Sequence, residues 1–584
     1  MSPTKSRGRA AQVEPAGRTT LFTGGVVLVL DGSSPAAEAM VVRDGRVAGV
    51  GTEGDMRTLG GAGAEHVDLH GATLMPGFVD THPHLLHFGT LAYPLVDIAD
   101  APTHAEIVER IRARAATTEP GQWIMTTPVG EPHYFIRRSY RDLAEQMLPN
   151  RHVLDTATAQ HPVFIQAWAP VIPNVCALNS AALAKVRITR ATPDRVEHVW
   201  IEKDAQGEPT GILRGSVNNY YTNDSFMNEL LRRIPMVQPH AALDGVRKAM
   251  AEYNRLGVTT VYEAHAMSAA EIGAYRALRE LGDLRVRVLT SLEAEAHGLA
   301  VSRALSMDQF LSNLELALSL TALSDDLLRS NGVTLSRGGP CWPGFLRMHQ
   351  PYRGPYGEPT RGITFVSSEK EEVALEFCAA RGLRLNFIGA GDRDHDEFLE
   401  HAETVARRFP IAERGWILQH AYLITQEQAR RYAALGFRVT TSMSFSWGKG
   451  DLLGARMGRH VWRDLTPLRR LLDAGLTVGC GSDWGPKNIF EHIELAQTHR
   501  FGGSGYQNLG PAQPVNREEA LRMWTRDAAA VLGWEGIGTL RPGSHADFIV
   551  VDRDPLACAL DDLPGTQVLR TVLAGQTVYD SGAL

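Results

Sequence analysis

Two histidines one residue apart, His82 and His84, lie near the end of the apolar stretch LMPGFVDTHPHLLHF at residues 74–88. Neutral imidazoles combined with a carboxylate form a ligand set that Zn²⁺ and similar divalent ions prefer. In an extended strand residues i and i+2 point the same way, so both imidazoles would face one point. An isolated pair of this kind could equally be two polar residues that close a strand. A metal site therefore requires further ligands from elsewhere in the chain.

Four other residues at the ends of apolar runs could supply those ligands. Asp483 ends LTVGCGSD, and we expect its carboxylate to bind the ion, although it could instead cap the turn that follows. His420, in GWILQHAYL, could be a ligand, a substrate contact or a buried histidine with a structural role. Glu263 and His265 end GVTTVYEAH. They could be ligands themselves, or they could lie next to the ligands without touching the ion.

A (β/α)₈ barrel would bring these residues together. Eight short apolar runs alternate with helical stretches, and they are TLMPGFVDTH (73–82), GVTTVYEAH (257–265), LRVRVLTSLEAE (284–295), GVTLSRGG (332–339), LRLNFIGAG (383–391), GWILQHAYL (415–423), FRVTTSMSFS (437–446) and LTVGCGSD (476–483). This alternation is typical of a TIM-type α/β barrel, which carries its chemistry at the carboxyl ends of its strands. Because the last strand of a closed barrel lies beside the first, Asp483 would approach His82 and His84.

Capping signals predict two helices among the later runs. TQEQARRYAALG has Thr425 at the N-cap, a glutamine at the capping-box position and Gly436 to end the helix. NREEALRMWTRDAAAVLG likewise opens on Asn516 and closes on Gly533, and we expect one helix there.

The chain ends and a long insertion complete the predicted architecture. Strand patterns and a hairpin at Asp44-Gly45 predict a small β-sandwich domain built from residues 20–72 and 538–584, after a disordered tail at 1–19. The barrel would occupy 73–537. Its first run ends at residue 82 and its second begins at 257, so we expect an insertion at about 95–240. Its aromatic stretches QAWAPVIPNV and NNYY suit a roof over the active site, and a separately folded domain is the alternative.

Composition excludes several classes of protein. The 66 Asp and Glu residues are interspersed with 59 Lys and Arg residues, so no basic surface for nucleic acid or anionic membranes is expected. No apolar segment predicts a signal peptide or a membrane span. Five scattered cysteines without CxxC spacing argue against a disulfide framework or a structural zinc site. We expect a cytoplasmic protein acting on a small molecule, and the sequence leaves open whether it forms a homodimer.

On these motifs the chain resembles the amidohydrolase superfamily, specifically its YtcJ-like amidohydrolase 3 branch, and is similar to N-substituted formamide deformylases. The resemblance covers nearly the whole chain after the tail and rests on MPGFVDTHPH, NSAAL, GEPTGIL, QHAYLITQEQARRYAALGF, GLTVGCGSD, EALRMWTRDAAAVLG and GTLRPGSHADFIVVDRDP. It implies a metal-dependent hydrolase that keeps His82, His84, His420 and Asp483 as metal ligands.

The chain departs from the family pattern at two barrel strands. The strand-4 lysine that bridges two metals in the family corresponds to Thr334, which cannot do so. The strand-5 histidine corresponds to Ile388 or, with a local shift, to Asn386, and an amide is a poor transition-metal ligand. We therefore expect one divalent ion, Zn²⁺ in the first instance with Fe or Mn as alternatives, rather than a pair.

The resemblance implies hydrolysis of an amide-type C–N bond by a metal-activated water, with Asp483 as proton acceptor and donor and with His420 or the ion polarising the carbonyl. Four residues near the expected pocket are candidates for substrate binding: Asn386, Trp484, Arg337 and Glu263. The alternatives are a non-hydrolytic metal-dependent reaction on a specialised metabolite and a catalytically silent partner subunit.

Overall fold

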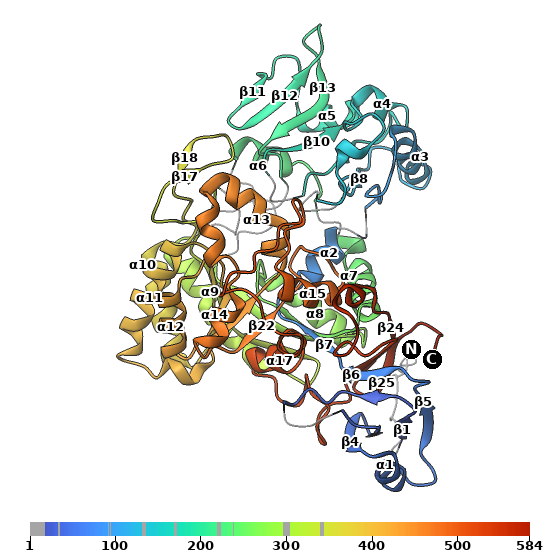
Figure 1. The fold of residues 1–584 in the computed structure, drawn as a ribbon. Helices are drawn as coiled ribbons and strands as arrows, with labels where there is room; N and C mark the ends of the chain where they lie inside the picture. Colours follow the sequence, from blue (N-terminus) through green and yellow to red (C-terminus); the bar gives the residue numbers. More distant parts are fainter. Residues whose placement is uncertain are drawn as a thin grey trace, which may run out of the picture.

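Eight parallel strands form the centre of the computed structural model (Figure 1). Their order is β22-β21-β20-β19-β16-β15-β14-β7. Their bounds are β7 Phe78–Asp80, β14 Val258–Glu263, β15 Arg287–Glu293, β16 Leu328–Ser336, β19 Leu385–Gly389, β20 Ile417–His420, β21 Arg438–Thr441 and β22 Val478–Cys480. Each of the eight predicted runs therefore contains one barrel strand, and the TIM-type barrel is confirmed.

The structure describes residues 18–32, 36–91, 93, 95–130, 136–168, 172–218, 224–236, 239–295, 304–338 and 344–584. Residues 1–17 of the predicted tail and 219–221 of the NNYY stretch lie outside this part of the chain.

The barrel closes where its last strand meets its first. The backbone N–H of Thr81 donates to the carbonyl of Cys480 at 3.2 Å, and that of Asp483 donates to the carbonyl of His82 at 2.8 Å. The hydroxyls of Thr81 and Thr440 also bond each other across the lumen. These contacts place the loop after β7 directly beside the loop after β22.

The first predicted strand, 73–82, is wrong in one respect, because it is two strands. β6 (Thr73–Pro76) pairs with β2 (Val26–Val27) and β23 (Phe548–Val551) in another sheet, and only β7 joins the barrel. Gly77 separates them, with its N–H donating to the carbonyl of Asp547 at 3.0 Å. A Cβ at this position would lie 2.3 Å from a Thr259 methyl group, so only glycine permits this crossing.

Two sheets contain strands from the ends of the chain. One has the order β4-β3-β1-β5 and the other β2-β6-β23-β24-β25. Their bounds are β1 Thr19–Thr23, β2 Val26–Val27, β3 Ala39–Arg43, β4 Arg46–Gly51, β5 Glu65–Asp68, β23 Phe548–Val551, β24 Val568–Leu573 and β25 Gln576–Asp580. The predicted hairpin at Asp44-Gly45 is confirmed, since both residues have positive φ between β3 and β4. Phe22, Met40 and Phe548 share one apolar core between these sheets.

A six-stranded sheet lies between β7 and β14 in the sequence and at one end of the barrel in space (Figure 1). Its strands are β8 Ile124–Thr126, β9 Val163–Ile165, β10 Asn174–Leu178, β11 Arg195–Val196, β12 Val199–Lys203 and β13 Pro209–Gly215. The helices of this segment are α3 His104–Ala115, α4 Arg151–Asp155, α5 Ser180–Val186 and α6 Ser225–Leu231.

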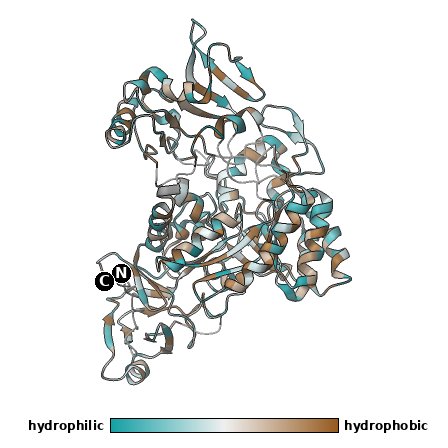
Figure 2. Cartoon of the chain, turned by 180° about the vertical axis from the view of Figure 1, so that it is seen from behind, coloured by the Kyte–Doolittle hydropathy of each residue, from teal (hydrophilic) through white to brown (hydrophobic). Residues whose placement is uncertain are grey.

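Amphipathic helices surround the barrel, and hydrophobic and hydrophilic stretches alternate along them (Figure 2). They include α7 Pro239–Arg255, α8 Ala269–Glu280, α9 Met307–Leu320, α10 Ser368–Arg381, α11 Asp392–Ala406, α12 Gln426–Ala434, α14 Leu468–Asp473 and α15 Ile489–Thr498. The capping box predicted for α12 at Thr425 and Gln428 is confirmed. None of the helices in the described part of the chain combines the length and apolarity that a membrane crossing requires.

The single helix predicted between Asn516 and Gly533 is wrong, because it is two helices, α16 (Arg517–Arg522) and α17 (Arg526–Leu532). The carbonyls of Met523 and Trp524 accept hydrogen bonds from Cys480 and Val79 instead of continuing the helix. The break therefore ties this segment to the last and first barrel strands.

A buried ion pair joins the barrel to the sheets of the chain ends. The Arg287 guanidinium in β15 binds both carboxylate oxygens of Asp547, at 2.6 and 3.0 Å, and both side chains are almost fully buried. The backbone N–H of Ala574 also donates to Asp547 at 2.7 Å.

Asp547→Ala is expected to lower the free energy of unfolding by ~3–5 kcal/mol, because it leaves the buried Arg287 charge without a counter-charge. Denaturant unfolding of the metal-loaded protein would measure this. Asp100→Ala is the matched control: its partner is Arg110 but the Asp100 side chain is 80% exposed, and a loss below about 1 kcal/mol is expected. Equal losses in the two variants would contradict the prediction.

Candidate metal centre

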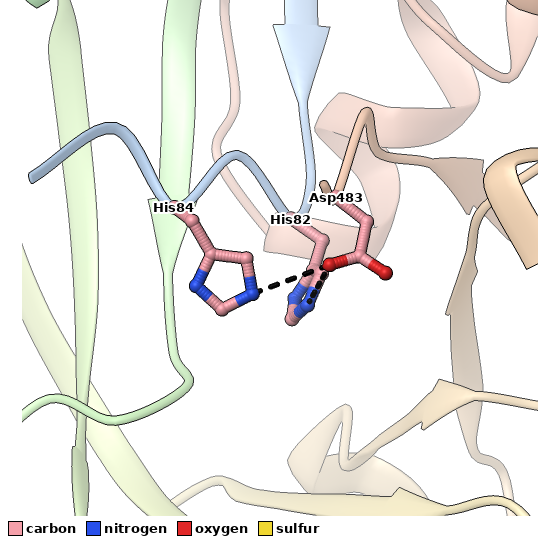
Figure 3. Close-up of side chains that lie close together, drawn as sticks. All are labelled: His82, His84 and Asp483. Atoms are coloured by element: carbon pink, nitrogen blue, oxygen red, sulfur yellow. Dashed lines mark ion pairs between the residues drawn. The ribbon is translucent and has the colours of Figure 1, made fainter. Parts of the chain in front are cut away.

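His82, His84 and Asp483 converge at the carboxyl ends of β7 and β22 (Figure 3). One Asp483 oxygen, Oδ1, lies 3.5 Å from His82 Nε2 and 3.3 Å from His84 Nε2. The three potential ligand atoms all lie within 4.8 Å of one another, and all three side chains are buried. The structure thus brings together the three residues that the sequence predicted from opposite ends of the barrel.

The two imidazoles do not converge by strand pleating, and that part of the prediction is wrong. β7 ends at Asp80, so both histidines lie in the loop that follows. His84 has φ of 54° and Asp483 has φ of 50°, a left-handed conformation that costs non-glycine residues of order 1–3 kcal/mol. Such a conformation persists only where the surrounding contacts fix it.

Asp80 supplies those contacts. Its Oδ1 accepts hydrogen bonds from the backbone N–H of His82 and of Ser482, each at 3.0 Å. Its Oδ2 accepts from the Ser482 hydroxyl at 2.7 Å. One fully buried carboxylate therefore holds the loop that carries the histidines against the loop that carries Asp483.

Two more imidazoles lie around the trio. The ring centroid of His420 is 5.2 Å from that of His82, and the ring of His265 is 5.6 Å from that of His84. His420 Nδ1 is buried and has no hydrogen-bond partner among the described residues. His265 Nδ1 lies 3.5 Å from a carboxylate oxygen of Glu293. His420 therefore has a ring nitrogen open to a further ligand, whereas His265 also has a carboxylate neighbour.

The protonation states of these groups suit a divalent ion. Burial lowers the pKa of His84 and of His420 well below the usual range, so both imidazoles are neutral. Burial opposes ionisation of Asp483, but the contacts with His82 and His84 outweigh it and hold the Asp483 pKa well below its usual value. Neutral imidazoles with an ionised carboxylate are the donor set of a divalent-ion site, so the residues present fit such an ion.

A chain of polar side chains fills the barrel lumen beneath the trio. The Thr334 hydroxyl donates to Ser291 at 3.1 Å, and the Asn386 amide donates to Thr334 at 3.2 Å. Asn386 also donates to Gln419, whose amide in turn contacts His82 Nδ1. Thr334 and Asn386 are thus bonded to each other and fully buried, and Ile388, the other position that the sequence matched to the family's strand-5 histidine, is also buried.

A family model described as the amidohydrolase family matches residues 65–579 of the chain. The chain belongs to the amidohydrolase family. It is an enzyme, a hydrolase that acts on carbon–nitrogen bonds other than peptide bonds. Together with the His-His-Asp cluster, this membership supports a divalent metal at the centre.

This amidohydrolase is similar to curated relatives over nearly its whole length. It is 29% identical to the N-substituted formamide deformylase of Arthrobacter pascens, over 96% of this chain and 98% of the relative. It is 24% identical to the putative amidohydrolase YtcJ of Bacillus subtilis, over 96% of this chain and 99% of that one. An uncharacterized metal-dependent hydrolase from Pyrococcus horikoshii OT3 shares the fold with a TM-score of 0.69 at 20% identity, over 93% of this chain and 99% of that structure.

Aromatic rings line one side of this amidohydrolase's metal centre. Trp484 stacks on His84 with ring centroids 4.7 Å apart. Phe88 lies 4.6 Å from Trp484, and Trp168, from the segment between β7 and β14, lies 6.2 Å from it. Lys487 Nζ lies over the Phe88 ring, 4.0 Å from its centroid, and donates to the carbonyl of Asp483.

The remaining predicted substrate contacts, Arg337 and Glu263, form hydrogen bonds with other parts of the protein. Arg337 binds Glu371, Glu397 and Ser368 through its two terminal nitrogens, in a buried ion-pair network beside α10 and α11. Glu263 accepts hydrogen bonds from the backbone N–H of Leu86 at 2.9 Å and from the Tyr275 hydroxyl at 2.7 Å. Glu263 therefore anchors the start of α2 (Leu85–Leu91), just after His84.

Sequence reasoning missed Asp80 and Gln419. Asp80 lies two residues before His82. Its importance depends on hydrogen bonds to Ser482, which is 402 residues away in the sequence. Gln419 precedes His420 in QHAYL and points into the lumen, where it contacts His82. Because side chains alternate between the two faces of a strand, the predicted strand could have placed Gln419 in the lumen. No local sequence pattern identifies the Asp80 contacts.

Asp80→Asn is expected to weaken metal binding by about 10- to 100-fold, because an amide cannot accept all three hydrogen bonds that fix the two loops. Competition with a chelator would measure the affinity. Ser482→Ala, which removes one of the three bonds, should have the smaller effect. An Asp80→Asn variant with unchanged affinity would contradict this role.

The stability of the enzyme should depend on pH through Glu263, since burial raises the pKa of its carboxyl to about 7. The carboxyl of Glu263 therefore keeps its proton in the folded state at pH values where the unfolded chain, with its ordinary carboxyl pKa, has already lost it. The stability that is present at low pH is lost as the pH rises through about 7. Glu263→Gln should remove this part of the slope of the unfolding midpoint against pH. The same slope in Glu263→Gln and in the wild type would contradict this role of Glu263.

Proposed function

We propose that this amidohydrolase hydrolyses the amide bond of a small N-substituted formamide with one divalent ion, Zn²⁺ in the first instance. His82, His84 and Asp483 would hold the ion, with His420 beside it. The observation that carries the proposal is the convergence of these three ligand atoms within 4.8 Å on one side of a filled polar lumen. The similarity to a formamide deformylase over 96% of the chain supports the substrate class.

The filled lumen favours one ion over two. A second ion would need ligands from β16 and β19, where Thr334 and Asn386 bond each other at 3.2 Å. Neither a hydroxyl nor an amide is a favoured ligand of Zn²⁺. The carboxylate of Glu293 bonds the Ser336 hydroxyl at 2.9 Å and the backbone of Ala266, so it is already committed.

The bound ion would supply an activated water and polarise the substrate carbonyl. Asp483 would accept the proton of that water and deliver it to the leaving amine, a role consistent with a carboxylate that is ionised before reaction. His420 would donate a hydrogen bond to the developing oxyanion through a ring nitrogen. Asp80 and Glu263 would keep the two loops and α2 in place during turnover.

The aromatic wall supports an apolar substituent on the amide nitrogen. Trp484 stacks on His84, and Phe88 and Trp168 pack against Trp484. Aromatic side chains bind apolar groups through large buried contact areas. An aromatic or branched N-substituent packed there would leave the formyl carbon near the trio.

Two further proposals concern the parts of the chain outside the barrel. We propose that residues 20–72 and 538–584 form one β-sandwich domain, supported by their shared apolar core. We also propose that the segment at about 95–240 roofs the site, supported by the Trp168–Trp484 contact. A small-molecule substrate, a cytoplasmic location and a homodimer stay predictions.

Release of formate from an N-substituted formamide tests the proposal. The metal-loaded wild type should produce equal amounts of formate and amine, and Asp483→Asn should lower kcat/KM by about 10²–10⁴-fold. Trp484→Ala should raise KM for a formamide with an aromatic N-substituent while leaving KM for N-methylformamide nearly unchanged. Metal-loaded enzyme that cleaves no formamide would overturn the proposed substrate class.

A further inference from the structure

A second pocket lies at the amino-terminal end of the barrel, away from the metal centre. It encloses about 280 Å³ and is lined by residues at the starts of β16 and β19 and by the end of α17. Its side chains include three arginines, Arg329, Arg381 and Arg384, together with Ser330 and Asn331. α17 lies on the side of the barrel opposite the six-stranded sheet (Figure 1).

Arg384 is the buried cation of this pocket. Its side chain is more than nine-tenths buried, with a relative exposure of 7%. Nη1 donates to the carbonyl of Leu532 at 2.7 Å, which satisfies the end of α17. Nε is buried without a hydrogen-bond partner among the described residues, and none of them accepts a bond from Nη2. Capping of α17 therefore uses one of the three guanidinium nitrogens.

The charge around Arg384 is not balanced by the protein. No aspartate or glutamate lines the pocket, and no described carboxylate forms an ion pair with Arg384. The neighbouring Arg438 is a second cation, and it also donates to carbonyls at the end of α17. Both arginines lie beside Gly533, where an added Cβ would be 2.6 Å from Arg384 Nη2 and 3.1 Å from Arg438 Nη1. A buried charge without a counter-charge is costly.

The other two arginines are only loosely paired with acids. Arg381 approaches Glu315 at 3.5 Å, and Arg329 approaches Asp326 at 3.9 Å. Arg329 also donates through Nε to the carbonyl of Asp325 at 3.3 Å. The Arg329 guanidinium also lies over the Trp534 ring, 4.2 Å from its centroid. Their planar donor groups can therefore turn towards a ligand in the pocket without breaking a close ion pair.

We propose that this pocket binds a small oxyanion, a phosphate or carboxylate group, through Arg384, Arg381 and Arg329. Guanidinium groups bind such groups in a bidentate manner with charge-assisted hydrogen bonds. The ligand supplies the counter-charge that the protein lacks around Arg384. The volume suits a small anion or the anionic end of a metabolite, with Ser330 and Asn331 as further hydrogen-bonding groups.

Calorimetric titration of the metal-loaded protein with inorganic phosphate, and separately with succinate, tests this site and distinguishes the two chemistries. One saturable site is expected for at least one anion. Arg329→Gln/Arg381→Gln should weaken it by at least about tenfold, since it removes two charged donors but leaves the Arg384 cap of α17 in place. Arg384→Lys, which keeps the charge but loses the planar fork, should also weaken it.

Two controls separate this pocket from the metal centre and from general charge effects. His82→Asn/His84→Asn removes the predicted ion and should leave anion binding unchanged. Arg463→Gln removes an arginine whose side chain is 77% exposed elsewhere and should also leave it unchanged. Absence of saturable binding for both anions would overturn the proposal. Equal binding by wild type and Arg329→Gln/Arg381→Gln, or loss of binding in His82→Asn/His84→Asn, would also overturn it.

Discussion

The Asp80 carboxylate is the contact on which the metal centre depends. It accepts hydrogen bonds from His82 in the loop after the first barrel strand and from Ser482 in the loop after the last. The barrel closure brings these loops side by side, but closure alone does not fix left-handed backbone at His84 and Asp483. The hydrogen bonds of Asp80 hold the neighbouring residues His82 and Ser482, and left-handed backbone of this kind persists only where surrounding contacts fix it. Barrel closure and the geometry of the His-His-Asp cluster are therefore linked through one side chain.

The polar lumen beneath the centre determines what chemistry this amidohydrolase can support. The Asn386 amide donates hydrogen bonds to Thr334 and to Gln419, and Gln419 contacts His82. This chain orients His82 from below, in the way that outer hydrogen bonds orient metal-ligating imidazoles. These side chains also occupy the positions on β16 and β19 from which ligands for a second ion would have to come. We propose a site with one ion on the basis of these contacts, and Trp484 stacked on His84 adds an apolar surface beside the centre.

Much of this could be predicted from the sequence, since the alternation of apolar runs and helices determines the barrel and the barrel places Asp483 beside His82 and His84. The errors have specific physical causes. The run 73–82 reads as one strand because no local pattern shows that Gly77 must cross between two sheets. The break between α16 and α17 depends on carbonyls that accept bonds from distant barrel strands. Asp80 was missed for the same reason, because its partners are far away in the sequence.

The number of metal ions per chain tests the central claim most directly. Elemental analysis of protein purified without added metal should give one equivalent of a divalent ion, and His82→Asn/His84→Asn should lose it. Two equivalents in the wild type would show that the lumen of Thr334 and Asn386 does not exclude a second ion. A metal-free wild type that also fails to bind added Zn²⁺ would contradict the assignment of His82, His84 and Asp483 as ligands.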